Sequence, residues 1–308
     1  MELSWLMRLR IAATVATGVI LIGILAWPLA APAEPFGAVL ADNLSFAGAI
    51  TLAALAFLAS FIAYFLSWPY GREIGILAVP SGLAIWAVRG SGMAGVMQAY
   101  PTLAQRQAIF ASFKWEPVFW LAIVAAGFGG VLLGQKIATK PQADKSEEKS
   151  DSKLNINLNS IFALAGSVLI AQFCIRIFAQ DVRIFDPRLG SVMAQPATGQ
   201  IVFAVLVSFG ITAFIFKKFL DVSYIWPTAA SALVTGFVIT AYVKQDILQY
   251  LVGHHPAVFF SDAVASILPV QMVAFGTLGS IAGYWLAVRY NYWRKHAQKS
   301  NSGRTQQI

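Results

Sequence analysis

The sequence predicts an all-α integral membrane protein with about eight transmembrane helices, and three observations support this class. Of its 308 residues, 58% are hydrophobic and 12% are charged, whereas ordinary soluble domains have roughly 45–50% and 25%. Eight apolar runs approach the roughly 20 residues that a bilayer core requires. The basic residues lie mostly between these runs and are distributed unequally between the two sides that the runs define.

Each apolar run is expected to form one span. The runs cover residues 11 to 29, 46 to 68, 74 to 88, 117 to 135, 156 to 178, 200 to 216, 223 to 243 and 264 to 288. The third run is the weakest, because Gly71 and Arg72 precede it and Arg89 follows it closely. Several tryptophans, among them Trp86 and Trp115, stand near predicted span ends, where they are expected to anchor the helices at the membrane interface.

Eight spans place both termini on the same side of the membrane. With the termini inside, the inner segments hold most of the 22 Lys and Arg residues, and the whole net charge of +8 falls on that side. This matches the positive-inside rule. The sequence therefore predicts a prokaryotic inner (plasma) membrane protein with both termini in the cytoplasm.

The N-terminal segment has an alternative interpretation. Arg8 and Arg10, the apolar run that follows and the small residues 31 to 33 resemble a cleavable signal peptide, although the run is long for that role. Its removal would leave seven spans, with the new N-terminus outside.

The chain divides at its one strongly hydrophilic stretch. Residues 136–155 contain five lysines, four acids and no aromatic residue, which is typical of a flexible, solvated linker; contact with anionic lipid is the alternative. We therefore expect a first four-helix membrane unit at 1–135, a charged cytoplasmic linker at 136–155, a second four-helix unit at 156–288 and a basic cytoplasmic tail at 289–308.

The two units resemble each other, which suggests an internal repeat. At a constant offset of 152 residues, four residues of the fourth span match four of the eighth: Pro117, Val118, Ala122 and Gly127 match Pro269, Val270, Ala274 and Gly279. In addition, PFGAVLA (35 to 41) resembles PRLGSVMA (187 to 194). A repeat with an even number of spans produces parallel copies, related by a pseudo-two-fold axis along the membrane normal. A central cavity is then expected between the halves.

Two glycine stripes lie in the same pair of spans and are interpreted as helix-packing faces. They comprise Gly127, Gly130 and Gly134 in the fourth span and Gly276, Gly279 and Gly283 in the eighth. Aligning the stripes directly needs an offset of 149, whereas the prolines require 152. The stripes therefore do not by themselves mark a functional site.

Binding candidates within the spans are few. Pro80 and Pro227 each free a backbone carbonyl in the third span of their half, and such interruptions point to transporter sites; Pro227 alternatively starts its helix. Gln172, Arg176 and Gln271 are the polar exceptions in the apolar runs, and Arg176 can alternatively extend to the interface. No acid is expected at mid-membrane, which disfavours ion coupling through a buried carboxylate.

The predicted outer loops offer weaker candidates. DVRIFDPR (181 to 188) contains two Asp-x-Arg triplets that can pair locally at little energetic gain. The loop from 89 to 116 is long enough for an amphipathic helix resting on the membrane, with Ile109, Phe110 and Phe113 on one side and Arg106 among its polar positions. His254 and His255 are weak metal candidates, because adjacent residues on a helix diverge and no metal-ligand spacing is present.

Motif analysis indicates no particular chemistry. We find no phosphate-binding loop, dinucleotide fingerprint or nucleophile elbow, so no cofactor, catalytic residue or nucleic-acid partner is expected. A lone Cys174 provides no internal disulfide.

Three function classes remain. The favoured class is a permease or carrier for a neutral or amphipathic small molecule or lipid, with its passage between the two repeats. The second is a non-catalytic subunit of a larger membrane complex, with membrane-protein partners or a homo-oligomer in addition to the lipid bilayer. The third and weakest is a membrane enzyme with an outer-face site that uses the histidines and acids of the loops.

Overall fold

The computed structural model describes residues 4–32, 37–138 and 153–305. The described structure is 78% helical. Among its residues, seven helices are long and apolar enough to cross a membrane, or eight if the bent pair Ile225–Ala241 and Gln245–His254 forms one span. This confirms the helical membrane class, whereas a small three-stranded antiparallel sheet was not predicted.

The first half runs from α1 to α8. Its elements are α1 (Trp5–Gly18), η1 (Val19–Leu25), α2 (Trp27–Ala30), η2 (Ala41–Asn43), α3 (Phe46–Leu66), α4 (Gly71–Ile74), η3 (Gly75–Leu77), α5 (Ala78–Arg89), α6 (Met93–Ala99), α7 (Leu103–Ser112) and α8 (Glu116–Ala138). The third span is therefore not one regular helix, because a short α-helix and a 3-10 turn precede α5.

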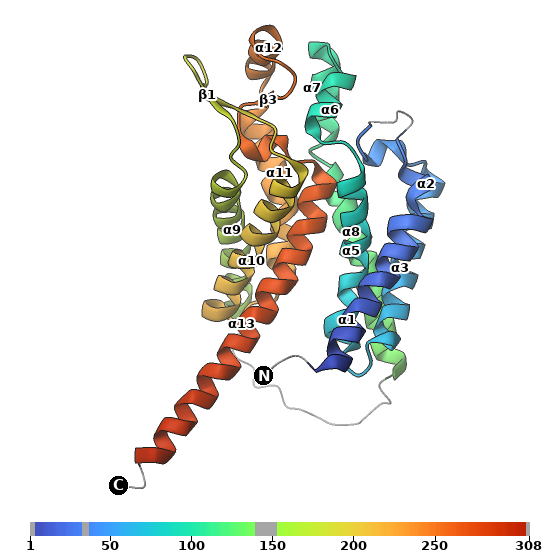
Figure 1. Cartoon of the computed structure of the whole chain (residues 1–308), viewed down its shortest axis with the longest axis vertical. Helices are drawn as coiled ribbons and strands as arrows, with labels where there is room; N and C mark the ends of the chain where they lie inside the picture. Colours follow the sequence, from blue (N-terminus) through green and yellow to red (C-terminus); the bar gives the residue numbers. More distant parts are fainter. Residues whose placement is uncertain (1–3, 33–36, 139–152, 306–308) are drawn as a thin grey trace.

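The second half runs from α9 to α13. Its elements are α9 (Lys153–Phe178), β1 (Arg183–Asp186), β2 (Gly190–Ala194), α10 (Thr198–Leu220), α11 (Ile225–Tyr242), α12 (Gln245–His254), β3 (Phe259–Phe260), η4 (Ala263–Ser266) and α13 (Pro269–Thr305). Helix α1 begins and helix α13 ends at the same end of the bundle (Figure 1).

Each half of the chain contains one helix pair with especially extensive contact. The most extensive contact is α3 with α8 in the first half and α10 with α13 in the second, while α5 packs on η1 and α1 as α11 packs on α9. Between the halves, α5 contacts α13 and α8 contacts α11. The spans containing α5 and α13 are also the most deeply buried, so these two helices form the centre of the bundle.

The glycine stripes lie at the two most extensive helix contacts. A Cβ atom on Gly130 of α8 would lie 2.1 Å from the carbonyl oxygen of Phe57 in α3, and one on Gly279 of α13 would lie 2.3 Å from that of Leu206 in α10. A Cβ on Gly283 would likewise lie 2.0 Å from the Gly210 carbonyl oxygen. The other stripe positions face side chains: Gly127 faces Val79 and Ser60, Gly134 faces Tyr64, and Gly276 faces Ser231 and Phe209. Only glycine permits the backbones to approach to this distance.

A layer of short elements covers the end of the bundle opposite the start of α1. We call this layer, formed by α6, α7, the sheet and α12, the cap (Figure 1). The hairpin pairs Arg183 with Met193 and Asp186 with Gly190, and β2 also pairs with β3. Gly190 has φ of 76°, a conformation that glycine adopts without a steric penalty. Helix α12 turns by 73° from α11 and so lies over the bundle.

Several details differ from the expected boundaries. Helix α13 continues through Thr305 without a break, so the expected tail at 289–308 begins as part of the last helix, with residues 306–308 outside the described residues. Most of the predicted linker, at 139–152, also lies outside them, as do two residues of the PFGAVLA match. Trp86 is not an interfacial anchor, because it is fully buried and its Nε1–H donates to the carbonyl of Gly23 at 3.3 Å.

Candidate functional site

A recess opens in the cap where the two halves meet. Helices α6 and α7 of the first half form one wall, and α12, β3 and η4 of the second half form the other. Its empty volume is about 350 Å³, a figure that includes the open space at its mouth.

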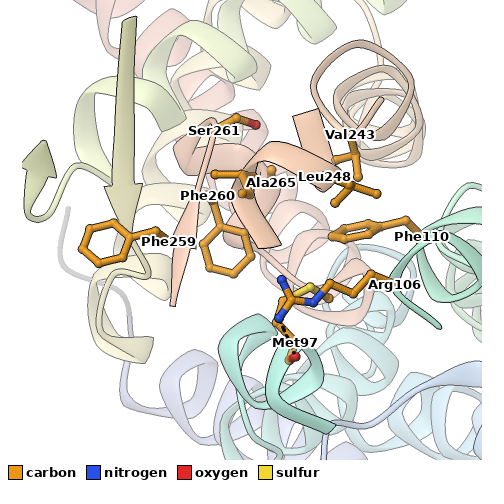
Figure 2. Close-up of a pocket in the computed structure, with 10 residues that line it drawn as sticks. Met97, Arg106, Phe110, Val243, Leu248, Phe259, Phe260, Ser261 and Ala265 are labelled. Atoms are coloured by element: carbon orange, nitrogen blue, oxygen red, sulfur yellow. Dashed lines mark hydrogen bonds between the residues drawn. The ribbon is translucent and has the colours of Figure 1, made fainter. Parts of the chain in front are cut away.

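The lining of the recess is apolar except at two positions. Apolar side chains come from both halves, among them Met97 and Phe110 from the first and Leu248 and Phe260 from the second (Figure 2). The polar lining residues are Arg106 and Ser261. The recess therefore combines a hydrophobic surface with a single positive charge.

Arg106 is held by the end of helix α6. Its Nε donates to the carbonyl of Tyr100 at 3.0 Å, and its Nη2 donates to that of Met97 at 3.1 Å. These carbonyls lie at the C-terminal end of α6, where a cation is favoured by the helix dipole. Arg106 is only 8% exposed, which corrects the expectation that it occupies the solvated face of an amphipathic helix.

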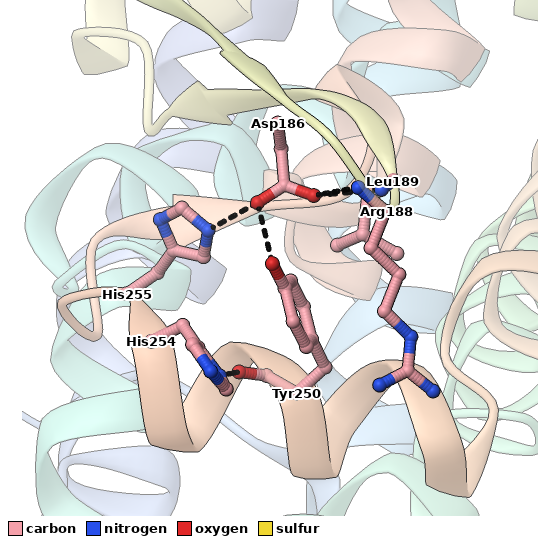
Figure 3. A network of polar contacts seen from close by, with 6 residues as sticks. All are labelled: Asp186, Arg188, Leu189, Tyr250, His254 and His255. Carbon is pink, nitrogen blue, oxygen red and sulfur yellow. Dashed lines mark hydrogen bonds and ion pairs between the residues drawn. The ribbon is translucent and has the colours of Figure 1, made fainter.

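A second cluster of polar groups lies between the hairpin and α12. The Oδ2 atom of Asp186 accepts hydrogen bonds from the Tyr250 hydroxyl at 3.0 Å and from His255 Nε2 at 2.9 Å (Figure 3). Its Oδ1 atom accepts from the backbone N–H groups of Arg188 and Leu189 at 2.8 and 2.7 Å. Asp186 thus does not pair with the guanidinium of its own triplet; that group lies 5.0 Å from the Tyr250 ring centroid instead.

Hydrogen bonding keeps the Asp186 carboxylate ionised. Burial alone raises the pKa of this group, but the bonds from Leu189, His255, Arg188 and Tyr250 outweigh it and lower the pKa to about 2. Because an ionised carboxylate only accepts hydrogen bonds, the Nε2 atom of His255 carries a proton in this arrangement.

This cluster connects the hairpin to α12 and to His255, the residue that follows it. The Tyr250 hydroxyl donates to the carboxylate and not to the imidazole. His254 points elsewhere, with Nδ1 3.0 Å from the Tyr250 carbonyl. Among the described residues, no group of three or more His, Cys, Asp or Glu side chains is placed to hold a metal ion.

Gln271 connects the two halves. It is 1% exposed, its Nε2 donates to the carbonyl of Ala87 in α5 at 3.1 Å, and its Oε1 accepts from the N–H of Leu268 at 3.1 Å. The side chain therefore bonds the first turn of α13 to the last turn of α5.

Arg176 lies at a different contact. Its Nε is 2.8 Å from Asp262 Oδ2, which ties the end of α9 to the segment before η4. Asp262 also accepts a hydrogen bond from the N–H of Val264. Burial raises the pKa of Asp262, against the lowering effects of that N–H and of Arg176.

The remaining predicted residues are dispersed. Gln172 is buried in α9, which packs mainly on α10 and α11 and not on the α5–α13 contact. Pro80 and Pro227 are both buried, and each is the third residue of its helix. Proline is tolerated there because first-turn N–H groups lack intrahelical partners. Pro80 follows the break in the third span, whereas Pro227 lies at an ordinary helix start.

Comparisons with protein-family models, with curated proteins and with solved structures found no match for this chain.

Proposed function

We propose that this protein is a carrier for an amphipathic small molecule or lipid, with its passage between two parallel four-helix halves. The observation that carries this proposal is the recess at the cap end of the junction between the halves, lined by both. Ligand sites of carriers with repeats lie at the interface between the repeats, near the bilayer midplane, and the recess opens at one end of that interface. The resemblance to these carriers is one of architecture, so the proposal rests on the position and lining of the recess.

An internal duplication is part of this proposal, and the helix contacts support it. An offset of 149 residues relates Gly130 to Gly279 and also relates their contact partners, Phe57 and Leu206. The same offset relates Gly127 and Ser60 to Gly276 and Phe209. Helix packing thus favours the glycine register over the proline register of 152.

The proposed orientation places both termini in the cytoplasm and the cap outside a prokaryotic inner membrane. The positive-inside distribution of Lys and Arg supports it. Under this orientation, the recess faces the outer side and receives its ligand from there.

The described conformation is closed beneath the cap. The Gln271 side chain of α13 donates to the Ala87 carbonyl of α5, and both residues are buried at this contact. A carrier must separate this contact during transport, so the bond from Gln271 to Ala87 breaks in the open state.

Cysteine accessibility tests this movement without knowledge of the ligand. In a Cys174→Ser background, Ala87→Cys places a thiol at the contact between the halves, where residue 87 is 2% exposed. If the open state is populated at roughly 0.1–10%, a membrane-impermeant maleimide should label Ala87→Cys at about that fraction of the rate at which it labels the exposed Gln98→Cys. The matched control is Ala56→Cys, which is fully buried in α3 within one half. If the maleimide labels neither Ala87→Cys nor Ala56→Cys, the carrier proposal is rejected.

The second function that we propose is a non-catalytic subunit of a membrane assembly. Helix α13 has 37 residues, whereas a bilayer requires about 20, and its last part extends away from the bundle (Figure 1). Such a protruding helix is available to a protein partner or to a second copy of the chain.

Purification in mild detergent separates the two proposals. A protein that co-purifies at fixed stoichiometry and is lost when residues 296–308 are deleted supports the assembly subunit. A lipid or metabolite that co-purifies with an otherwise isolated chain supports the carrier.

A further inference from the structure

We propose that the cap recess binds an anionic amphiphile, with a carboxylate or phosphate head group on Arg106 and an apolar chain against Phe110 and Leu251. This inference rests on the proposed function in that it names the ligand class of the same recess. It identifies a charged head group as the feature that the site selects.

The positive charge of Arg106 has no counter-charge among the described residues. A buried cation is costly unless a counter-charge or a full set of hydrogen bonds offsets the loss of water. Within the described part of the chain, no carboxylate lies within 4.0 Å of this guanidinium, and two of its five N–H donors are bonded, both to neutral carbonyls. The electrostatic environment therefore favours an anion.

The guanidinium of Arg106 is held in a fixed position, with N–H groups left over to donate. The bonds to Tyr100 and Met97 fix the side chain by Nε and one Nη, and Figure 2 shows the guanidinium lying between Met97 and Phe260 at the recess. A carboxylate or phosphate oxygen accepts charge-assisted hydrogen bonds from the outward-facing N–H groups. Arg106 is thus held in place before the ligand arrives, which lowers the entropic cost of binding.

Apart from Ser261, the rest of the recess lining is apolar and suits a hydrocarbon chain. The neighbouring wall is formed by the apolar side chains of Phe110, Leu248, Leu251 and Phe260. Free phosphate makes no contact with this apolar surface, whereas an alkyl chain is stabilised when its methylene groups are removed from water. The combination of one cation with an apolar wall therefore selects an amphiphile.

The position along the bundle fits a ligand that arrives from a lipid leaflet. Ala265, which lines the recess, lies just before Pro269, where the apolar stretch of α13 begins. The head group then lies near the level at which lipid head groups are found. This placement makes a fatty-acid-like carboxylate accessible without crossing the membrane.

The test uses the full-length protein in nanodiscs of zwitterionic lipid, with laurate, dodecyl phosphate, dodecanol and inorganic phosphate as probes in calorimetric titrations. We expect laurate and dodecyl phosphate to bind at least tenfold more tightly than dodecanol, because a charge-assisted hydrogen bond contributes about 1.5–3 kcal/mol. Inorganic phosphate should bind more weakly than dodecyl phosphate. Equal affinity for laurate and dodecanol, or for the two phosphates, overturns the proposal.

Variants assign the binding to the recess. Arg106→Gln should weaken laurate binding at least tenfold, whereas Lys114→Gln, which removes an exposed charge next to α7, should leave it unchanged. Because Arg106 also bonds the end of α6, Ala265→Leu provides an independent variant that keeps this arginine and fills the apolar part. Unchanged laurate affinity in Ala265→Leu, or in a folded Arg106→Gln protein, overturns the site.

These measurements are separate from the test of transport. Equilibrium binding of laurate does not require the halves to move. If laurate does not bind but the maleimide labels Ala87→Cys, the proposed ligand is rejected and the carrier is kept. If laurate binds but Ala87→Cys is not labelled, the ligand is kept and the carrier is rejected.

Discussion

At the residue scale, the carboxylate of Asp186 links the hairpin to the end of α12. It accepts four hydrogen bonds, two from backbone N–H groups of the hairpin turn and one each from Tyr250 and His255. An asparagine side chain at this position has only one oxygen to accept hydrogen bonds. Its NH₂ group would face groups that also donate, so bonds would be lost. We expect Asp186→Asn to lower the thermal unfolding midpoint at pH 7, whereas Asp181→Asn, an exposed carboxylate before the same hairpin, should leave it unchanged.

The same residue predicts a pH dependence. An aspartate in an unfolded chain titrates near 3.9, whereas the pKa of Asp186 is about 2. A lowered pKa in the folded state contributes stability above roughly pH 4 that is lost as the pH falls through about 2. The difference in unfolding midpoint between wild type and Asp186→Asn should therefore shrink as the pH falls from about 4 towards 2. A difference that is independent of pH down to 2 contradicts the assigned role.

The Asp186 cluster and the Arg106 site differ in how far the sequence could predict them. Asp186 lies 64 residues from Tyr250 and 69 from His255, and no local pattern relates such distant positions in a single sequence. Arg106 was predictable in part, because it precedes Phe110 by four residues and therefore shares its helix face. The prediction placed Arg106 on the polar face because of its charge, although its spacing from Phe110 indicated the apolar face. That prediction was wrong.

At the element scale, backbone contact at the glycine stripes controls how closely helices pack. An alanine Cβ at Gly130 or Gly279 meets a carbonyl oxygen that cannot move without its helix. We expect Gly130→Ala and Gly279→Ala each to reduce the free energy of unfolding by about 1–3 kcal/mol, the usual cost of overpacking. Denaturant titration of the purified protein, monitored by tryptophan fluorescence, measures this change.

Gly129 provides the matched control on the same helix. A Cβ there lies 3.7 Å from the Phe57 ring, an ordinary contact, so Gly129→Ala should be neutral or stabilise the protein by up to about 1 kcal/mol through helix propensity. If Gly129→Ala and Gly130→Ala destabilise equally, the effect arises from something other than the α3–α8 contact.

Elements within the membrane were easier to predict than those of the cap. A span must be apolar over its whole length irrespective of its neighbours, so α3, α8 and α10 fall close to the predicted runs. The hairpin and α12 are stabilised by contacts between distant segments, and the short strands carry no clear alternation of their own. The cap was therefore expected only as loops with one amphipathic helix.

At the scale of the whole molecule, two helix bundles meet along α5 and α13. The sequence predicted a division into two units from composition and span count, but it could not predict which helices lie at the junction, because central and peripheral spans are similarly apolar. Gln271 was singled out only as a polar exception. Its bond to the Ala87 carbonyl, 184 residues away, identifies it as a connection between the halves.

If the halves associate through this contact, a covalent connection between them is dispensable once the protein has folded. We expect a protease site inserted between residues 138 and 153 and cleaved in detergent to leave both fragments together on size-exclusion chromatography, with little change in the unfolding midpoint. Gln271→Ala should weaken this association, because it removes a buried hydrogen bond and leaves the Ala87 carbonyl without that donor, at a cost of about 1–3 kcal/mol. Gln98→Ala, an exposed amide in the cap, serves as the control. Separation of the cleaved wild-type fragments would show that the α5–α13 contact is too weak to hold the molecule together, and a closed state maintained by Gln271 would have to be abandoned with it.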